Sequence, residues 1–234
     1  MAEQNKGMSD LWRRLRFVFM AIVIYRLGTH IPIPGIDPAR LAALFDQNQG
    51  TILEMFNLFS GGALERMSIF ALNVVPYISS AIIMQLFSNS IPYLQELKKD
   101  GQAGRNQITQ YTRYGTVLLA FVQASALAVT LGASGLAYEP GTSFFISAVF
   151  SVVAGTIFLM WLGEQISERG IGNGISIIIA TSILTGIPGA IGQALEQARQ
   201  GDLNILLLLG IGVLAMLVIA IVVFIERGQR RITV

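Results

Sequence analysis

The sequence contains no cysteine and a single histidine among its 234 residues. The absence of cysteine excludes disulfide bonds, thiol nucleophiles and thiolate metal ligands within these residues. His30 alone cannot build a metal site of the His-Glu-x-x-His type, and neither a Gly-x-Ser-x-Gly motif nor a phosphate-binding Gly-x-x-x-x-Gly-Lys motif occurs. We therefore expect no enzymatic activity, no catalytic residue, no metal site and no cofactor.

Charged residues are also scarce. They make up 13% of the chain, whereas hydrophobic residues make up 53%, and soluble domains usually carry about 25% charge. After the first long apolar run, the interiors of the runs contain no Asp or Glu. Ion-coupled carriers usually keep an ionisable group near the middle of the membrane. The composition therefore predicts a membrane protein and argues against a proton-coupled carrier or an intramembrane hydrolase.

Six apolar runs are long enough to cross a bilayer, which takes roughly 20 residues. Arg26 interrupts the first run, and an arginine near the middle of a membrane helix costs at least about 2.5 kcal/mol. Arg26 is therefore either a functional charge or one that reaches the interface or a partner inside the bundle. The predicted spans are 17–34, 68–91, 114–131, 144–162, 174–191 and 205–225.

The distribution of lysine and arginine predicts the orientation of these spans. Both termini and the even-numbered connections hold twelve of these residues, and the other connections hold three. Cytoplasmic segments carry the excess of positive charge in membrane proteins. We therefore expect a multi-pass protein of the bacterial inner membrane whose N-terminus and C-terminal end both lie in the cytoplasm.

Two groups of uncharged side chains stand out within the apolar runs. Polar residues such as Asn73 and Gln123 need hydrogen-bond partners in apolar surroundings. They either link helices or line a route that is sometimes wet. Small residues recur every four positions, which lets helix backbones approach closely in lipid. The small residues are Ala120, Ala124 and Ala128 in one run, and Ser147, Ser151 and Gly155 in the next.

Two pairs of apolar residues each lie four positions apart. Val74 and Ile78 bracket Pro76, and Ile175 and Ile179 follow a glycine-rich stretch. Residues four apart share one face of a helix. Such pairs commonly face lipid or neighbouring helices, but two facing pairs can also form an apolar constriction that excludes water and ions by dewetting.

Long blocks of the sequence resemble the SecY family, the central subunits of the bacterial protein-conducting channel. The resemblance runs from about Leu11 to the end of the chain, and the sequence is similar to those of proteobacterial members of the family. The blocks are "IPIPGID" (31–37), "GTILEMFNLFSGGAL" (50–64), "SIFALNVVPYIS" (68–79), "QYTRYGT" (110–116), "LMWLGEQISERGIGNGISIII" (159–179) and "VFIERGQRR" (223–231).

The resemblance implies an all-α, polytopic helix bundle of the SecY type. In that family, ten membrane helices form two inverted halves around an hourglass pore, and the second helix begins with a short re-entrant plug helix. Here the plug would occupy about 57–67, before a spanning part at 68–91. The implied plug residues are Asn57, Phe59, Ser60, Gly61, Gly62, Ala63, Leu64, Glu65 and Arg66.

The resemblance also implies a ring of aliphatic side chains in the pore, on Val74, Ile78, Ile175 and Ile179. The family commonly has isoleucine at the first of these positions, so valine would seal slightly less tightly. A lateral gate towards lipid would include Ser79, Gln85 and Gln123. Cytoplasmic partners would dock on a basic loop at 93–113 and on the C-terminal tail, through Lys98, Lys99, Arg105, Arg227, Arg230 and Arg231; alternatively, these charges only set the topology.

The implied function is a channel that passes unfolded secretory polypeptides across the membrane and releases membrane segments into it. The implied partners are the membrane subunits SecE and SecG, the SecA ATPase, the ribosome, signal peptides, nascent polypeptides and membrane lipid, with no nucleic-acid contact beyond the ribosome. Broken helices also occur in small-solute secondary transporters, which are the alternative, and an assembly scaffold without a pore is a third class.

The chain departs from the family in length, since six predicted spans stand against ten. We expect residues 1–191 to form the N-terminal half, with five spans and the plug, and residues 192–234 to add the sixth span and the start of a cytoplasmic loop. Six helices cannot enclose the pore alone. Either the chain is a fragment or the remainder of the channel is supplied elsewhere.

Overall fold

The structure is a computed structural model, and it describes residues 2–47, 57, 60–139, 141–200 and 205–228. Its described part is helical, with two isolated β-bridges, Pro32 with Ser68 and Ile36 with Ala137, and no β-strand. The helices are α1 (Ala2–Gly28), α2 (Pro38–Gln47), α4 (Val75–Ser90), α5 (Pro92–Lys99), α6 (Gly101–Ala133), α7 (Thr142–Arg169), α8 (Gly174–Gln200) and α9 (Ile205–Glu226). The predicted all-α fold is confirmed.

Each of the six predicted spans overlaps a helix. Within the described residues, α6, α7, most of α8 and most of α9 are long and apolar enough to cross a membrane. The remaining two helices that overlap predicted spans are α1 and α4. They are less clearly membrane-spanning, because α1 includes a charged N-terminal stretch and α4 has only 16 residues. The chain is therefore a multi-pass membrane protein.

The second predicted span starts later than the sequence analysis placed it. Residues 61–74 form turns and a bridge, and the helix begins at Val75 rather than at 68. Asn73 has a left-handed backbone with φ 49°, which cannot continue an α-helix. Pro76 then lies in the first turn of α4. Backbone N–H groups in a first turn have no partner within the helix, so a proline there costs no helical hydrogen bond.

The predicted basic loop at 93–113 is also helical in the structure. α5 buries Leu94 and Leu97 on one side and ends at Lys99. Gly101, with φ 69°, makes the turn into α6. The segment was predicted as a loop because its charges hide two apolar residues three positions apart, which are enough to hold a two-turn helix against its neighbour.

The chain divides into two compact units, Met1–Gly186 and Ile187–Val234. The boundary falls inside α8, next to Pro188, which removes one helical hydrogen bond. In the second unit, α9 is exposed from Leu209 onward despite its apolar sequence. An apolar, unburied surface of this length is expected of a helix that meets lipid or other membrane helices.

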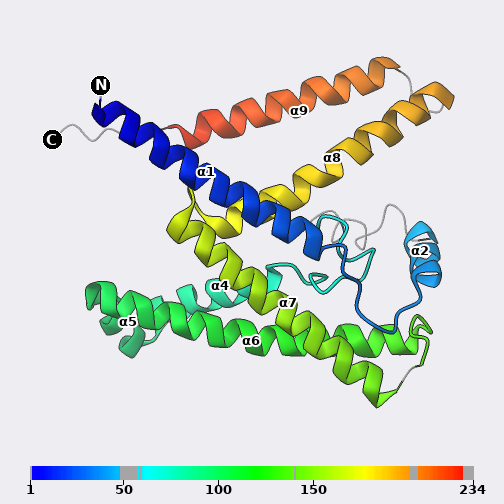
Figure 1. The fold of residues 1–234 in the computed structure, drawn as a ribbon, viewed down its shortest axis with the longest axis horizontal. Coiled ribbons are helices and arrows are strands. Elements are labelled where there is room, and N and C mark those ends of the chain that lie inside the picture. Colours follow the sequence, from blue (N-terminus) through cyan, green and yellow to red (C-terminus); the bar gives the residue numbers. More distant parts are fainter. Residues whose placement is uncertain (1, 48–56, 58–59, 140, 201–204, 229–234) are drawn as a thin grey trace. The chain divides into compact units, whose positions relative to one another are not determined.

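In the first unit, α7 packs along α6, α4 packs against α6, and α1 contacts α7 (Figure 1). Ala120, Ala124 and Ala128 are buried, as their spacing predicted. In α7 the predicted stripe is only partly correct, because Ser147 is exposed and only Gly155 is fully buried. A Cβ on Gly155 would lie 2.0 Å from the backbone oxygen of Ile69, so the absence of a side chain here lets the non-helical segment pack directly against α7.

Candidate functional site

The four predicted ring residues meet in one apolar cluster of the first unit. Val74 is 2% exposed and belongs to its buried core, and Ile78, Ile175 and Ile179 pack against it partly buried. Ile175 lies directly over Gly163, where an added Cβ would be 2.5 Å from its Cδ1 atom. The sequence placed these residues in pairs on two separate helices, and the structure brings the pairs together. Their role as a pore ring stays a prediction.

One of the predicted plug residues, Ala63, belongs to the same cluster, and another, Leu64, packs against a second apolar cluster of the unit. Ala63 is fully buried, and Ser60 is 3% exposed. We call residues 60–66 the plug segment. Its backbone turns through Gly61 and Gly62, with φ of 67° and 78°, values that glycine adopts without steric cost. Phe59 of the predicted plug lies outside the described residues.

Hydrogen bonds close the plug segment into a compact loop. The Asn57 side chain accepts a hydrogen bond from the Glu65 backbone at 3.0 Å and donates one to the Glu65 carboxylate at 3.0 Å. The Ser60 hydroxyl donates to the Asn57 carbonyl and accepts from the Leu64 backbone N–H. These bonds satisfy backbone groups that a regular helix would have paired internally.

Arg26, the charge inside the first apolar run, has a partner within the fold. Its guanidinium donates a hydrogen bond to the carbonyl oxygen of Gly61 at 2.9 Å. The arginine is therefore paired inside the bundle, and its functional role stays a prediction. Its partner is the backbone of the plug segment.

Tyr25 and Ser182 are site residues that the sequence analysis missed. The Tyr25 hydroxyl lies 2.6 Å from the Ser182 hydroxyl and 3.3 Å from the carbonyl oxygen of Ser60. The Asn73 amide donates to the Ser182 hydroxyl at 3.1 Å. One signal was available, because Ser182 lies seven residues after Ile175 and so shares a helix face with a predicted ring residue.

The predicted lateral-gate residues are not all brought together. Gln123 lines a cavity of about 340 Å³ with Asn73 and with Ser60 and Leu64 of the plug segment. Ser79 is half-buried and Gln85 is exposed, and neither lines that cavity. A different residue links α4 to α6: the Ser80 hydroxyl donates a hydrogen bond to the carbonyl oxygen of Thr112 at 2.8 Å. The gate assignment remains a prediction.

Most of the predicted docking charges are exposed in the structure. Lys98 and Arg105 flank the turn between α5 and α6, and both are exposed. Lys99 and Arg227 are exposed as well, whereas Arg230 and Arg231 lie outside the described residues. Arg113, at the same end of α6, pairs with Glu164 of α7 at 2.7 Å. The exposed charges are accessible to a partner, and the Arg113 pair ties two helices together.

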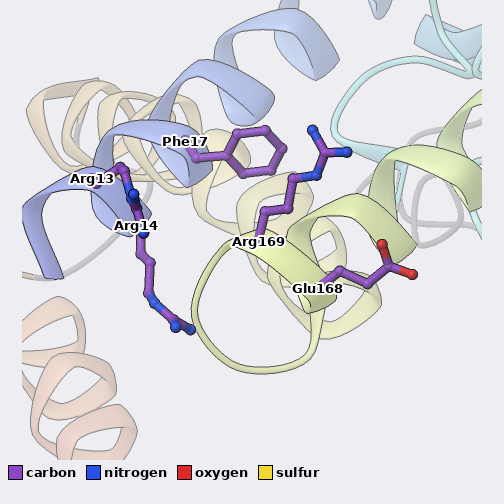
Figure 2. Close-up of a pocket in the computed structure, with 5 residues that line it drawn as sticks. All are labelled: Arg13, Arg14, Phe17, Glu168 and Arg169. Carbon is purple, nitrogen blue, oxygen red and sulfur yellow. The ribbon is translucent and has the colours of Figure 1, made fainter. Parts of the chain in front are cut away.

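A basic cleft lies where the N-terminal part of α1 meets the end of α7 (Figure 2). Its volume is about 420 Å³, and it is lined by Arg13, Arg14 and Phe17 of α1 and by Glu168 and Arg169 of α7. Asp10 forms ion pairs with both Arg13 and Arg14. Within the described residues, no group of three or more His, Cys, Asp or Glu side chains is placed to hold a metal ion.

Comparisons with known proteins agree with one another. A family model described as SecY matches residues 68–234. The Protein translocase subunit SecY of Pseudomonas aeruginosa is 62% identical over 233 residues, which cover the whole of this chain and 53% of the relative. The Escherichia coli K12 subunit of the same name is 57% identical, over 97% of this chain and 52% of the relative. This chain therefore spans about half the length of these curated relatives.

Solved structures share the fold at low sequence identity. Sec61 in the canine ribosome-channel complex from the endoplasmic reticulum matches with a TM-score of 0.66 and 20% identity, over 96% of this chain and 50% of that one. A SecY protein whose plug domain is described as stabilising the closed state of the translocation channel matches with a TM-score of 0.55 and 22% identity, over 83% and 42%.

Gly61 lies where the plug segment packs closely against α8. A Cβ there would lie 3.1 Å from the Ser182 Cα atom, and the backbone is left-handed. We expect Gly61→Ala to destabilise the protein by about 1–2 kcal/mol from the backbone alone, with a further loss from the contact. Gly135→Ala is the matched control, because its φ is 69° and nothing lies within 4 Å of its Cβ. Thermal unfolding in detergent measures both, and equal shifts in the midpoint would contradict the close packing.

Proposed function

This chain belongs to the SecY family, and from this premise we propose that it is the channel-forming subunit of a preprotein translocase. The channel passes unfolded secretory polypeptides across the bacterial inner membrane and releases membrane segments sideways into lipid. The observation that carries the proposal is the convergence of Val74, Ile78, Ile175 and Ile179 in one apolar cluster, with the plug segment folded against it.

An apolar ring suits a conduit for unfolded chains. Aliphatic side chains offer a passing peptide no hydrogen bonds or charges to hold it, and they resist ions because water leaves a narrow apolar constriction. Side-chain rotation and helix movement can widen such a ring. The plug segment closes it from one side, since its buried face ends in Ala63 within the same cluster. The channel is a passive conduit with no catalytic step of its own.

The energy for transport comes from partners in this proposal. A motor such as SecA or a translating ribosome docks on the exposed basic residues at the turn between α5 and α6 and near Arg227, while SecE and SecG complete the membrane complex. Signal peptides enter the lateral gate and reach lipid there. The Sec61 structure in a ribosome-channel complex supports this kind of partner. Family membership disfavours the small-solute transporter.

Replacing ring residues separates a channel from a scaffold. We expect Ile78→Gln, and independently Ile179→Gln, to raise the ion leak of the assembled channel severalfold, because a polar side chain makes the constriction easier to wet. Ile83→Gln is the matched control on another face of the same helix, since Ile83 is five positions from Ile78 and 40% exposed. Conductance across planar bilayers measures the leak. A scaffold without a pore would show lower stability in these variants and no change in conductance.

We also propose that both termini lie in the cytoplasm, as the excess of positive charge predicts. Because these 234 residues contain no cysteine, single cysteines can be introduced at exposed positions and labelled from one side. A membrane-impermeant maleimide added to spheroplasts with a sealed inner membrane should label Tyr138→Cys and leave Gln102→Cys unlabelled. The reverse pattern would invert the orientation.

A further inference from the structure

We propose that Tyr25, Arg26, Asn73 and Ser182 form a hydrogen-bonded latch that holds the plug segment closed and sets how readily it is displaced. This inference rests on the proposed function and deepens it by naming the groups that position the plug. The four residues come from α1, from the turns before α4 and from α8. Their polar groups meet at the carbonyl oxygens of Ser60 and Gly61 and at the Ser182 hydroxyl.

Consecutive residues of α1 hold consecutive carbonyl groups of the plug segment. The Tyr25 hydroxyl lies 3.3 Å from the Ser60 oxygen, and the Arg26 guanidinium lies 2.9 Å from the Gly61 oxygen. A hydrogen bond from a charged donor is stronger than one between neutral groups. The plug segment is therefore fixed in register against α1, which apolar contacts alone do not achieve because they have no preferred direction.

Ser182 connects α1 and the turns before α4 to α8. Its hydroxyl lies 2.9 Å from the Ile178 carbonyl, 2.6 Å from the Tyr25 hydroxyl and 3.1 Å from the Asn73 amide. A serine hydroxyl donates once and accepts twice, so donation to Ile178 leaves two acceptor sites for Tyr25 and Asn73. Alternatively, Ser182 donates to Tyr25, whose own proton then points to the Ser60 oxygen. Tyr25 has a single proton, so only the second arrangement carries the hydrogen bond to the plug segment, and the latch requires that arrangement.

Burial makes the latch cooperative. Tyr25 is 1% exposed, Asn73 is 4% exposed and Ser182 is fully buried. A hydrogen-bonding group that loses its partner in apolar surroundings pays the full desolvation penalty. The plug segment therefore stays closed until α1 and α8 separate or water reaches the cluster, and then all of these bonds are lost together. The apolar ring blocks ions, and the latch determines when the block is removed.

The test uses the assembled channel that contains this chain, with Tyr25→Phe, Ser182→Ala and the double variant. Backbone N–H groups of Ala63, Leu64, Glu65 and Arg66 are hydrogen-bonded in the closed plug, so their hydrogen exchange reports its opening. We expect each single variant to accelerate this exchange by about fivefold, as the loss of one buried hydrogen bond predicts. The acceleration of exchange in the double variant should be smaller than the product of the two single accelerations, because both substitutions remove the same hydrogen bond between Tyr25 and Ser182.

Two matched controls separate the latch from general loosening. Thr116→Val removes a buried hydroxyl that donates to Thr112 four residues earlier, as Ser182 does to Ile178, but it does not touch the plug. Tyr77→Phe removes the hydroxyl of a half-buried tyrosine in α4. Exchange in the plug segment should be unchanged in both controls.

The outcomes distinguish failure of the latch from failure of the proposed function. Plug exchange at the wild-type rate in Tyr25→Phe and Ser182→Ala, in preparations that still translocate a secretory precursor, overturns the latch and leaves the channel function intact. Equal acceleration in the controls also overturns the latch. Absence of precursor translocation by the unmodified channel, together with its motor and membrane partners, overturns the proposed function itself.

Discussion

The structure depends on one constraint, which is that non-helical backbone packed among membrane helices must satisfy its own polar groups. Residues 61–74 leave the helical conformation between α1, α7 and α8, where little water is available to pair with the backbone. Their partners come from several directions. The Ile33 N–H donates to the Met67 oxygen at 2.8 Å, and the Ile69 N–H donates to the Ile31 oxygen at 3.0 Å. Tyr25 and Arg26 supply the side-chain partners for the plug segment.

This constraint explains why polar and apolar groups lie so close together at the site. The apolar cluster supplies the burial that holds Ala63, Phe70 and Val74 between α1, α7 and α8. That burial is favourable only because the accompanying carbonyl and N–H groups are paired. A continuous helix through the same space would satisfy its backbone internally and would leave nothing that could be released. In the proposed channel, the irregular segment is therefore both the seal and the part that moves.

The sequence predicted much of this arrangement because local patterns decide it. Apolar runs located the helices, and the pairs Val74 with Ile78 and Ile175 with Ile179 identified side chains that converge in space. The late start of α4 was missed because the left-handed Asn73 depends on contacts that a hydropathy pattern does not contain. Tyr25 and Ser182 were missed for a related reason. Their hydrogen bond joins residues 157 positions apart, and no local spacing reveals such a partner.

The central claim is that the plug segment, seated on the apolar ring, keeps the channel closed to small solutes. Ion conductance of the assembled channel after deletion of residues 57–66 tests it most directly. The account predicts a higher resting conductance than that of the unmodified channel, because the ring is left without its cover. A resting conductance equal to that of the unmodified channel would contradict the account.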